Sequence, residues 1–457
     1  MTLAAGPSLR PAARRVVEAA LAEGAQHAEA FVQATDGVAA RIDRDSVQGV
    51  ESARERGVGL RVVVRGRYGF AYATSDADLR RLVSSAIAAA RRGRPGGSFP
   101  EPSRLPAAPR TYDPAVARAT PARLCAALLR ELSAAHRTHA LVRLAGGGAT
   151  ASVERVALAN DHGLAVEERG THASVSAYAI LRDGAGPATT GHEFKQSRFV
   201  DALSAPVGRA AASLAVRSRR PRAAPRGRVR MVLSPEVGAE LLELALRGLR
   251  LEPLRRGQSP FRAKPGEKVA SPSVSIVDDP LLPGGLAAGA FDDDGFPARR
   301  HEIVREGTRV GHFASLADGW RYAEPPQGSS LRAAGGDRSY RSLPVAVGRC
   351  LRIEGPRRTR SDLLREARGG VLVRDVIGVH TANSATGEFQ VTSTLLFSLR
   401  GGEEGPALRP VVVSGSVKSF LAGIRALSRE EKDLHGSASG VSLRMPYLLV
   451  EGLSLTG

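Results

Sequence analysis

The chain has 457 residues, of which 42% are hydrophobic and 24% are charged, and 65 Lys and Arg against 46 Asp and Glu give a formal net charge of +19. This composition is typical of a soluble globular protein, and the length predicts two domains rather than one. No stretch approaches the ~20 consecutive apolar residues of a membrane span, and residues 1–15 lack a signal-peptide pattern. We therefore expect no membrane association and a cytoplasmic location.

The positive charge has two interpretations. A basic balance is expected of proteins that bind nucleic acid. However, only five of the 65 basic residues are lysines, which is typical of the codon usage of a GC-rich genome. Aromatic residues, which could stack on bases, make up only 4% of the chain. We therefore do not expect nucleic acid as a partner.

The N-terminal part of the chain predicts a sheet flanked by helices. Residues 11–24 have apolar side chains at helical spacing, and a second amphipathic helix is predicted over residues 77–92, capped by Ser75 and Asp76. Between them, five runs with period-two alternation predict an antiparallel meander. This order indicates an α+β fold in which the helices pack on one face of the sheet. The five predicted strands span residues 27–35, 38–43, 48–55, 57–64 and 68–74.

Residues 93–121 contain seven prolines, so we expect an irregular segment that runs over the surface. Arginines interrupted by proline occupy residues 217–230, and we interpret this run as a solvated linker at a domain boundary. The predicted N-terminal α+β domain therefore spans residues 1–222. Between the two segments, the pattern predicts helices over residues 121–135 and 198–217 and strands over residues 140–144, 149–160 and 163–181.

The predicted C-terminal domain, residues 223–457, is rich in strands. Its first helix is expected over residues 234–249, with Ser234 as the N-cap and Pro235 at the first helical position. Two further helices are expected over residues 361–367 and 416–426. We predict a curled or barrel-like sheet with a few helices. The expected strands span residues 228–233, 274–276, 299–305, 310–313, 345–353, 371–377, 388–399, 410–414 and 447–455.

The residues alone do not compose a complete metal site. A zinc hydrolase helix carries two histidines with a glutamate between them, because neutral imidazoles bind the ion and the carboxylate activates its water. Of the ten histidines, only His136 and His139 could share a helix face, and they lack a third ligand. The two cysteines, Cys125 and Cys350, are too few for a thiolate cluster, and we expect both to be reduced and buried.

Other catalytic patterns are also incomplete. The run from Asp292 to Gly295 lacks the spacing of a calcium loop, and turn formation by Asp and Gly explains it. The segment from Gly436 to Gly440 has alanine where a nucleophile elbow needs serine. The glycines at 57–59 and 146–148 lack the dinucleotide-binding pattern.

Several longer motifs resemble one known family. Residues 57–62, followed by a turn and the sequence Tyr-Gly-Phe-Ala-Tyr-Ala from Tyr68, look like the N-terminal domain of the TldD/PmbA family. The second half adds Val-Asp-Asp-Pro at 277–280, Phe-Asp-Asp-Asp-Gly-Phe-Pro at 291–297, and Thr-Gly-Glu-Phe at 386–389. The resemblance covers nearly the whole chain, and it is carried by the order and spacing of motifs that are individually weak.

The resemblance implies two related subunits. One resembles a zinc metalloprotease, with a His-Glu-x-x-x-His helix and a cysteine near the C-terminus. The other, the PmbA or TldE type, lacks these ligands and completes a heterodimer that cleaves unfolded or small peptides. When Glu243 is aligned with the motif glutamate, Leu242 and Arg247 occupy the two histidine positions, and residues 434–445 contain no cysteine. The implied zinc ligands are therefore missing.

We accordingly expect a PmbA/TldE-like subunit without catalytic or metal-binding residues of its own. Zinc is expected in a TldD-like paralogue that forms a heterodimer with this chain, although a homodimer remains open, and the peptide-contacting residues are not identified. The alternative is an adaptor or regulator, similar to a gyrase modulator, that binds nucleic acid or an acidic protein through its basic surface. A third hypothesis is a stand-alone hydrolase that uses Asp292, Asp293 and Asp294.

Overall fold

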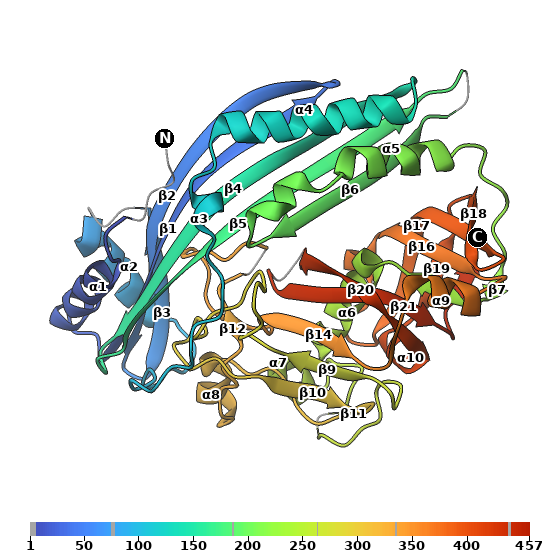
Figure 1. Cartoon of the computed structure of the whole chain (residues 1–457). Coiled ribbons are helices and arrows are strands. Elements are labelled where there is room, and N and C mark those ends of the chain that lie inside the picture. The colour runs from blue at the N-terminus through green and yellow to red at the C-terminus, as the bar shows by residue number, and fades with distance from the viewer. Residues whose placement is uncertain (1–5, 75–77, 185–186, 263, 334–335, 437–439) are drawn as a thin grey trace.

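The computed structural model describes residues 6–74, 78–184, 187–262, 264–333, 336–436 and 440–457. It confirms the α+β class, because an N-terminal antiparallel half-barrel sheet and a C-terminal curled sheet lie against each other (Figure 1). In the described residues, no helix has the length and apolar character needed to cross a membrane. The division into domains at residues 222 and 223 stays a prediction.

The N-terminal sheet consists of six strands in the order β3-β2-β1-β4-β5-β6, and every neighbouring pair is antiparallel. The four runs predicted between residues 27 and 64 are two continuous strands. Gly37 does not break β1, because it lies in register between Ala53 and Ser152 of the flanking strands. The strands are β1 (His27–Asp43), β2 (Ser46–Val64), β3 (Arg67–Ala73), β4 (Val142–Asn160), β5 (Ala165–Leu181) and β6 (Thr189–Ser197).

Helices cover the outer face of this sheet, as predicted (Figure 1). On α4, Leu124, Leu128, Leu132 and Ala135 recur at helical spacing and are buried against the sheet. The helices are α1 (Arg10–Ala22), α2 (Leu79–Ala90), α4 (Pro121–Thr138) and α5 (Val207–Arg217).

One predicted helix in this half needs correction, and one predicted cap is not tested. The cap predicted at Ser75 and Asp76 lies outside the described residues. Within the described part of α2, the side chain of Asp78 accepts from the Arg81 amide. The helix predicted over residues 198–217 is divided into the 3-10 turn η2 (Val200–Ser204) and α5. Pro206 separates them, because its ring has no N–H to continue a helix.

The proline-rich segment is not wholly on the surface. It includes the short helix α3 (Pro114–Ala117), and Phe99 is buried against Val63 and Leu316. The Trp320 indole also donates to the Ser98 carbonyl at 3.2 Å. This segment therefore fastens the N-terminal sheet to the C-terminal half of the chain.

The C-terminal sheet is mixed, with parallel pairs β8·β16 and β14·β21 among antiparallel ones. The run predicted over residues 345–353 is divided between two strands, and residues 310–313 are not a strand. Its strands are β7 (Gly227–Arg228), β8 (Met231–Leu233), β9 (Ser275–Asp278), β10 (His301–Arg305), β11 (Thr308–Arg309), β14 (Cys350–Glu354), β15 (Arg357–Arg358), β16 (Val371–Ile377), β17 (Glu388–Arg400), β18 (Glu403–Leu408), β19 (Val412–Ser416), β20 (Ile424–His435), β21 (Ser442–Val450) and β22 (Ser454–Thr456).

Helix α6 (Pro235–Gly248) lies inside the C-terminal domain and packs on β21 and β16. The predicted cap is confirmed, since the Ser234 side chain accepts from the Val237 amide and Pro235 begins the helix. Most of its side chains are buried on all sides, which is typical of an interior helix. The remaining elements are α7 (Leu251–Arg255), α8 (Leu316–Tyr322), η3 (Val379–Thr381), α9 (Arg360–Glu366), α10 (Val417–Gly423) and the two-stranded pair β12 (Ser330–Leu331) and β13 (Val345–Ala346).

Candidate functional site

The three positions that match the zinc motif lie on the second half of α6. Leu242 is fully buried in the apolar core, Glu243 is buried, and Arg247 is partly exposed. A leucine side chain offers no lone pair, and a guanidinium carries its positive charge at any physiological pH. These side chains therefore do not fit a zinc ion, and we derive no metal chemistry for this helix.

A carboxyl group that the sequence analysis missed lies on the same helix. The pKa of Glu240 is raised to about 7, first by burial and then by the nearby carboxylates of Asp375 and Glu243. Glu240 is thus partly protonated near neutrality. Its sequence signal was the spacing from Glu243, three residues on, which places the two side chains on neighbouring turns.

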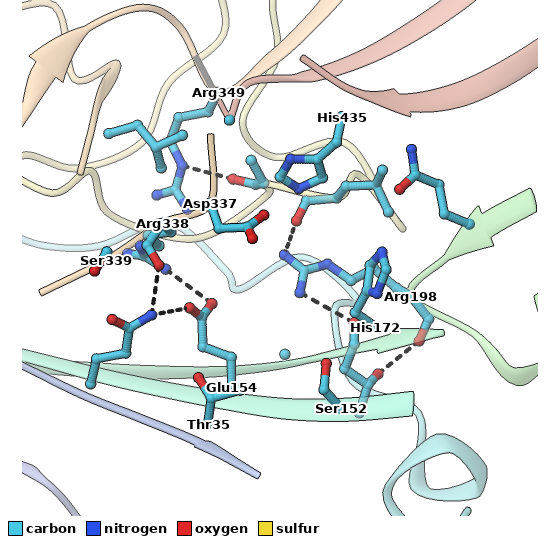
Figure 2. Close-up of a pocket in the computed structure, with 18 of the residues that line it drawn as sticks. Thr35, Ser152, Glu154, His172, Arg198, Asp337, Arg338, Ser339, Arg349 and His435 are labelled. Carbon is cyan, nitrogen blue, oxygen red and sulfur yellow. Dashed lines mark hydrogen bonds and ion pairs between the residues drawn. The ribbon is translucent and has the colours of Figure 1, made fainter. Parts of the chain in front are cut away.

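A polar cavity of about 510 Å³ lies between the two halves of the chain (Figure 2). Its walls come from the sheet face opposite the helices, on β1, β2, β4, β5 and β6, and from C-terminal loops. Representative lining residues are Thr35, Ser152, Glu154, His172, Gln196, Arg198, Asp337, Arg338, Ser339, Arg349 and His435.

Two histidines line this cavity as neutral rings. His172 and His435 lie edge to face, with ring centroids 6.4 Å apart. Burial, the neighbouring His435 and Arg198 lower the pKa of His172 to about 4, and burial also lowers the pKa of His435. At neutral pH both imidazoles can therefore donate and accept hydrogen bonds without carrying a charge.

Arg198 is buried at the cavity wall and links three segments. Its guanidinium donates to the carbonyl groups of Gly285 and Thr171, at 3.2 Å each, and to that of Leu286. Among the described residues no carboxylate forms an ion pair with it, and burial lowers its pKa. No hydrogen bond among the described lining residues joins a serine hydroxyl to either imidazole. The arrangement can therefore hold polar groups, but it does not compose a nucleophile and base.

The aspartates at 292–294 do more than form a turn. Their side chains are fully buried, which corrects the explanation by turn formation alone. Arg338 forms an ion pair with Asp293 and contacts Glu168 of β5 at 2.7 Å. Burial would raise the pKa of Asp293, but Arg338, Arg349 and the hydrogen bond from the Arg332 amide together lower it. For Asp292, burial and the Asp294 carboxylate raise the pKa well above its usual value.

A second buried ion-pair group joins the two halves. Arg61 of β2 contacts Glu29 of β1 at 2.6 Å and Asp294 at 2.8 Å, and Arg332 contacts Glu29 at 2.5 Å. All four side chains are almost completely buried. We call Glu29, Arg61, Asp294 and Arg332 the buried charge cluster. Because its ion pairs join the N-terminal sheet to the C-terminal loops, the cluster fixes the position of these two parts relative to each other.

Two glycines of the motif at residues 57–62 have a structural explanation. A Cβ atom on Gly57 would lie 2.2 Å from the Tyr340 ring, and one on Gly59 would lie 2.3 Å from the Tyr340 carbonyl oxygen. Tyr340 is fully buried, and its amide donates to Gln33 of β1 at 2.9 Å. The glycines therefore let the C-terminal loop lie directly on the N-terminal sheet.

The other candidates from the sequence are scattered. His136 contacts Asp45 at 2.9 Å, and His139 is the C-cap residue that follows α4. Cys350 is buried as expected, whereas Cys125 is only half-buried. The three motif positions of α6 do not line the cavity. His172, Arg198 and His435 come from three distant segments and form no sequence motif, which is why the sequence analysis missed them.

Comparison with known proteins gives one consistent result. Three family models match the chain: PmbA/TldA metallopeptidase domain 1 over residues 28–90, the central domain over residues 114–219, and the C-terminal domain over residues 226–457. A metalloprotease of Methanothermobacter thermautotrophicus is 25% identical over 396 residues, which cover 83% of this chain and 82% of that protein. An uncharacterized protein of Methanocaldococcus jannaschii is 24% identical over 410 residues, 88% of this chain and 91% of that protein.

Solved structures agree in fold. TldE from Thermococcus kodakarensis superposes with a TM-score of 0.88 at 22% identity, covering 97% of this chain and 99% of that one. A Thermotoga maritima protein described as a candidate modulator of a DNA gyrase superposes with a TM-score of 0.82 at 21% identity. The superposition covers 98% of this chain and 100% of that one. The C-terminal domain model matches more than half of the chain, and two further models of the same family match the residues before it. This chain therefore belongs to the PmbA/TldD metallopeptidase family.

Proposed function

We propose that this chain is a non-catalytic, PmbA/TldE-like subunit of a cytoplasmic zinc metallopeptidase that degrades or processes unfolded or small peptides. The main support for this proposal comes from α6, where a buried leucine and an arginine occupy the positions at which the motif has histidines. Because neither side chain can ligate zinc, the metal and the hydrolytic step would belong to a partner.

The cysteines support the same proposal. The motif includes a cysteine near the C-terminus, but the chain has only Cys125 and Cys350. Burial raises the pKa of Cys350 to about 12, so its thiol stays protonated at neutral pH. Zinc is bound by the thiolate rather than the thiol, so Cys350 is a poor substitute ligand.

The cavity and a free strand edge are what this subunit would contribute. Along residues 46–57, β2 pairs with β1 on one side, whereas its described pairing with β3 begins only at Val58. Glu55 of this edge also lines the cavity. An extended peptide could add its backbone to the edge, which gives affinity with little sequence selectivity. The neutral imidazoles would then hydrogen-bond peptide groups that enter the cavity.

The decisive experiment compares the chain alone with the chain co-expressed with a zinc-bearing paralogue of the His-Glu-x-x-x-His type. We expect no peptide hydrolysis by the isolated chain, a stable complex with the paralogue, and hydrolysis by that complex. A matched complex whose paralogue carries Gln in place of the motif Glu should be inactive. Peptidase activity of the isolated chain, or of the complex with the Gln variant, would contradict the proposal. Activity only in a self-associated form would favour a homodimer.

Backbone addition has its own test. Binding of a fluorescent peptide to the complex with the Gln variant should weaken when alternate amides of the peptide are N-methylated, because methylation removes donors to the strand edge. Equal affinity for both peptides would exclude this binding mode.

An adaptor role is the second candidate, because one segment is exposed and strongly basic. Arg220, Arg222, Arg226 and Arg228 are exposed, and none forms an ion pair within the described residues. Binding of nucleic acid through this segment would fall steeply with rising salt, since phosphate contacts release counterions. A binding measurement over a salt series therefore separates the two candidates.

A further inference from the structure

The N-terminal sheet carries a group of potential metal ligands that is separate from α6 and from the cavity. His27 is the first residue of β1, and Asp161 and His162 lie in the turn between β4 and β5. One ligand atom from each residue lies within 4.8 Å of the other two. The group exists because β1 and β4 are neighbours, with Glu29 opposite Asn160 at this end of the sheet.

The distances between these atoms suit a shared ion. His27 Nδ1 lies 2.8 Å from Asp161 Oδ2, and His162 Nε2 lies 3.5 Å from the same oxygen. Ligands around a tetrahedral zinc ion at about 2.0–2.1 Å are roughly 3.3 Å apart, so the two distances bracket the required spacing. The two imidazole rings stack nearly parallel, with centroids 5.5 Å apart.

One of the three ligand atoms forms no hydrogen bond with any described residue. His162 Nε2 is shielded from solvent and forms no hydrogen bond within the part of the chain that the structure describes, although Asp161 Oδ2 lies 3.5 Å away. A pair between His27 and Asp161 explains the position of the first imidazole, whereas the second has only the longer contact of 3.5 Å with the same oxygen. A cation between the three side chains satisfies this nitrogen, because it accepts the lone pair that no donor reaches.

The surrounding groups hold the ligands in place. Asp161 Oδ1 accepts from the Ala28 amide at 3.0 Å, which leaves Oδ2 toward the histidines. The Asn160 side chain accepts from the His162 amide at 3.0 Å and donates to the Pro100 carbonyl at 2.7 Å. Such outer contacts orient the ligands of metal sites and strengthen their affinity. Gly163, with φ of +87°, completes the turn.

We propose that His27, Asp161 and His162 bind a divalent transition-metal ion of the zinc class, with a water molecule in the fourth position. Two imidazoles and one carboxylate favour zinc, cobalt or nickel over calcium and magnesium, which prefer oxygen ligands. Nδ1 of His27 must lose its proton to bind, and in a neutral ring that proton moves to Nε2. The ion would fasten the start of β1 to the end of β4.

The test uses the full-length, tag-free chain, stripped with a chelator and titrated calorimetrically with Zn²⁺. We expect one saturable site, a rise in Tm on zinc addition, and a d–d absorption band on titration with Co²⁺. Asp161→Asn and His162→Gln should each weaken binding by about tenfold or more and abolish the rise in Tm. Circular dichroism of the zinc-free variants checks that they fold, and His27→Gln provides a third variant if one does not.

His136→Gln is the matched control. Its ring contacts Asp45 at 2.9 Å in a histidine–aspartate pair, and this pair belongs to no three-ligand group among the described residues. We expect the control to bind zinc as the unaltered chain does. Absence of saturable binding, or equal affinities in the control and the ligand variants, would overturn the proposal. Zinc that survives all the ligand substitutions would instead lie elsewhere and would also count against the proposed role of α6.

Discussion

Helix α6 and the buried charge cluster fill the interior in opposite ways. Around Leu242, side chains of β21, β16 and α10 form a continuous apolar core. In the cluster, Glu29, Arg61, Asp294 and Arg332 are equally buried, but each charge depends on its partners. Apolar packing is non-directional and tolerates other shapes of similar volume, whereas a buried ion pair fails when one member is lost. The C-terminal core is thus held by apolar packing, whereas the junction between the two halves adds a buried charge cluster to apolar contacts such as those of Phe31 and Phe291.

The largest effect is expected at the junction. Arg61→Met leaves two buried carboxylates with less compensation, and it should lower the free energy of unfolding by about 4 kcal/mol in urea denaturation. Arg54→Ala is the control on the same strand, because its pair with Asp36 is exposed on the arginine side, and it should cost less than about 1 kcal/mol. Similar losses for the two variants would break the comparison.

The next effect is expected in the apolar core. Leu242→Ala removes a fully buried side chain and should cost about 3 kcal/mol, from lost burial and from the cavity left behind. Leu129→Ala on α4 is the control, since Leu129 is 57% exposed, and its cost should be small. A variant that unfolds as easily at position 129 as at 242 would show that α6 is not part of the core.

Acid should weaken the junction through His172. Its pKa is about 4 in the folded chain against an ordinary value of 6.5, so the unfolded chain binds more protons between these values. Stability conferred by the neutral ring is complete above pH 6.5 and is lost as the pH falls toward 4. His172→Gln should remove this loss, a relative gain of about 3 kcal/mol at pH 4 compared with pH 7. His192→Gln, which alters an exposed ring, should leave this loss of stability in place. If the two variants showed the same dependence of stability on pH, the loss could not be assigned to His172.

Glu240 should act in the opposite direction and more weakly. Its folded pKa is about 7 against 4.5, so the folded chain binds more protons and loses stability as the pH rises through 7. Glu240→Gln should gain about 1 kcal/mol relative to the unaltered chain at pH 8 compared with pH 4, because partial exposure reduces the full effect. Denaturation at the two pH values measures this gain, and Glu18→Gln on an exposed face of α1 is the control. If Glu240→Gln were instead stabilised more at pH 4 than at pH 8, the prediction would be wrong.

The sequence predicts what local rules decide. The cap at Ser234, the proline after it and the apolar spacing define α6 without any tertiary information. The bounds of β16 also agree, because Val371, Leu372 and Val373 form a short apolar run that begins a buried strand. The predicted length of β1 was wrong because Gly37, whose local preference is for a turn, pairs with both neighbouring strands.

Long-range contacts could not be predicted from the same patterns. A run of aspartates indicates a turn, and only the tertiary structure shows that Arg61 and Arg338 bury it. Strand β20 was missed because residues 429–433 are all charged, although the strand pairs with β21. The cavity residues are brought together by the docking of two halves, so no window of the sequence contains them.

The pairing of β1 with β4 limits how this protein can be divided. The first family model covers β1 to β3 and the second covers β4 to β6, yet the two stretches share one sheet from Glu29↔Asn160 to Asp43↔Gly146. A fragment that ends after residue 90 would leave the long side of β1 without its neighbour, and a fragment of residues 114–219 would do the same to β4. Exposed strand edges of this length promote aggregation. Expression trials should therefore keep the first 219 residues as one piece.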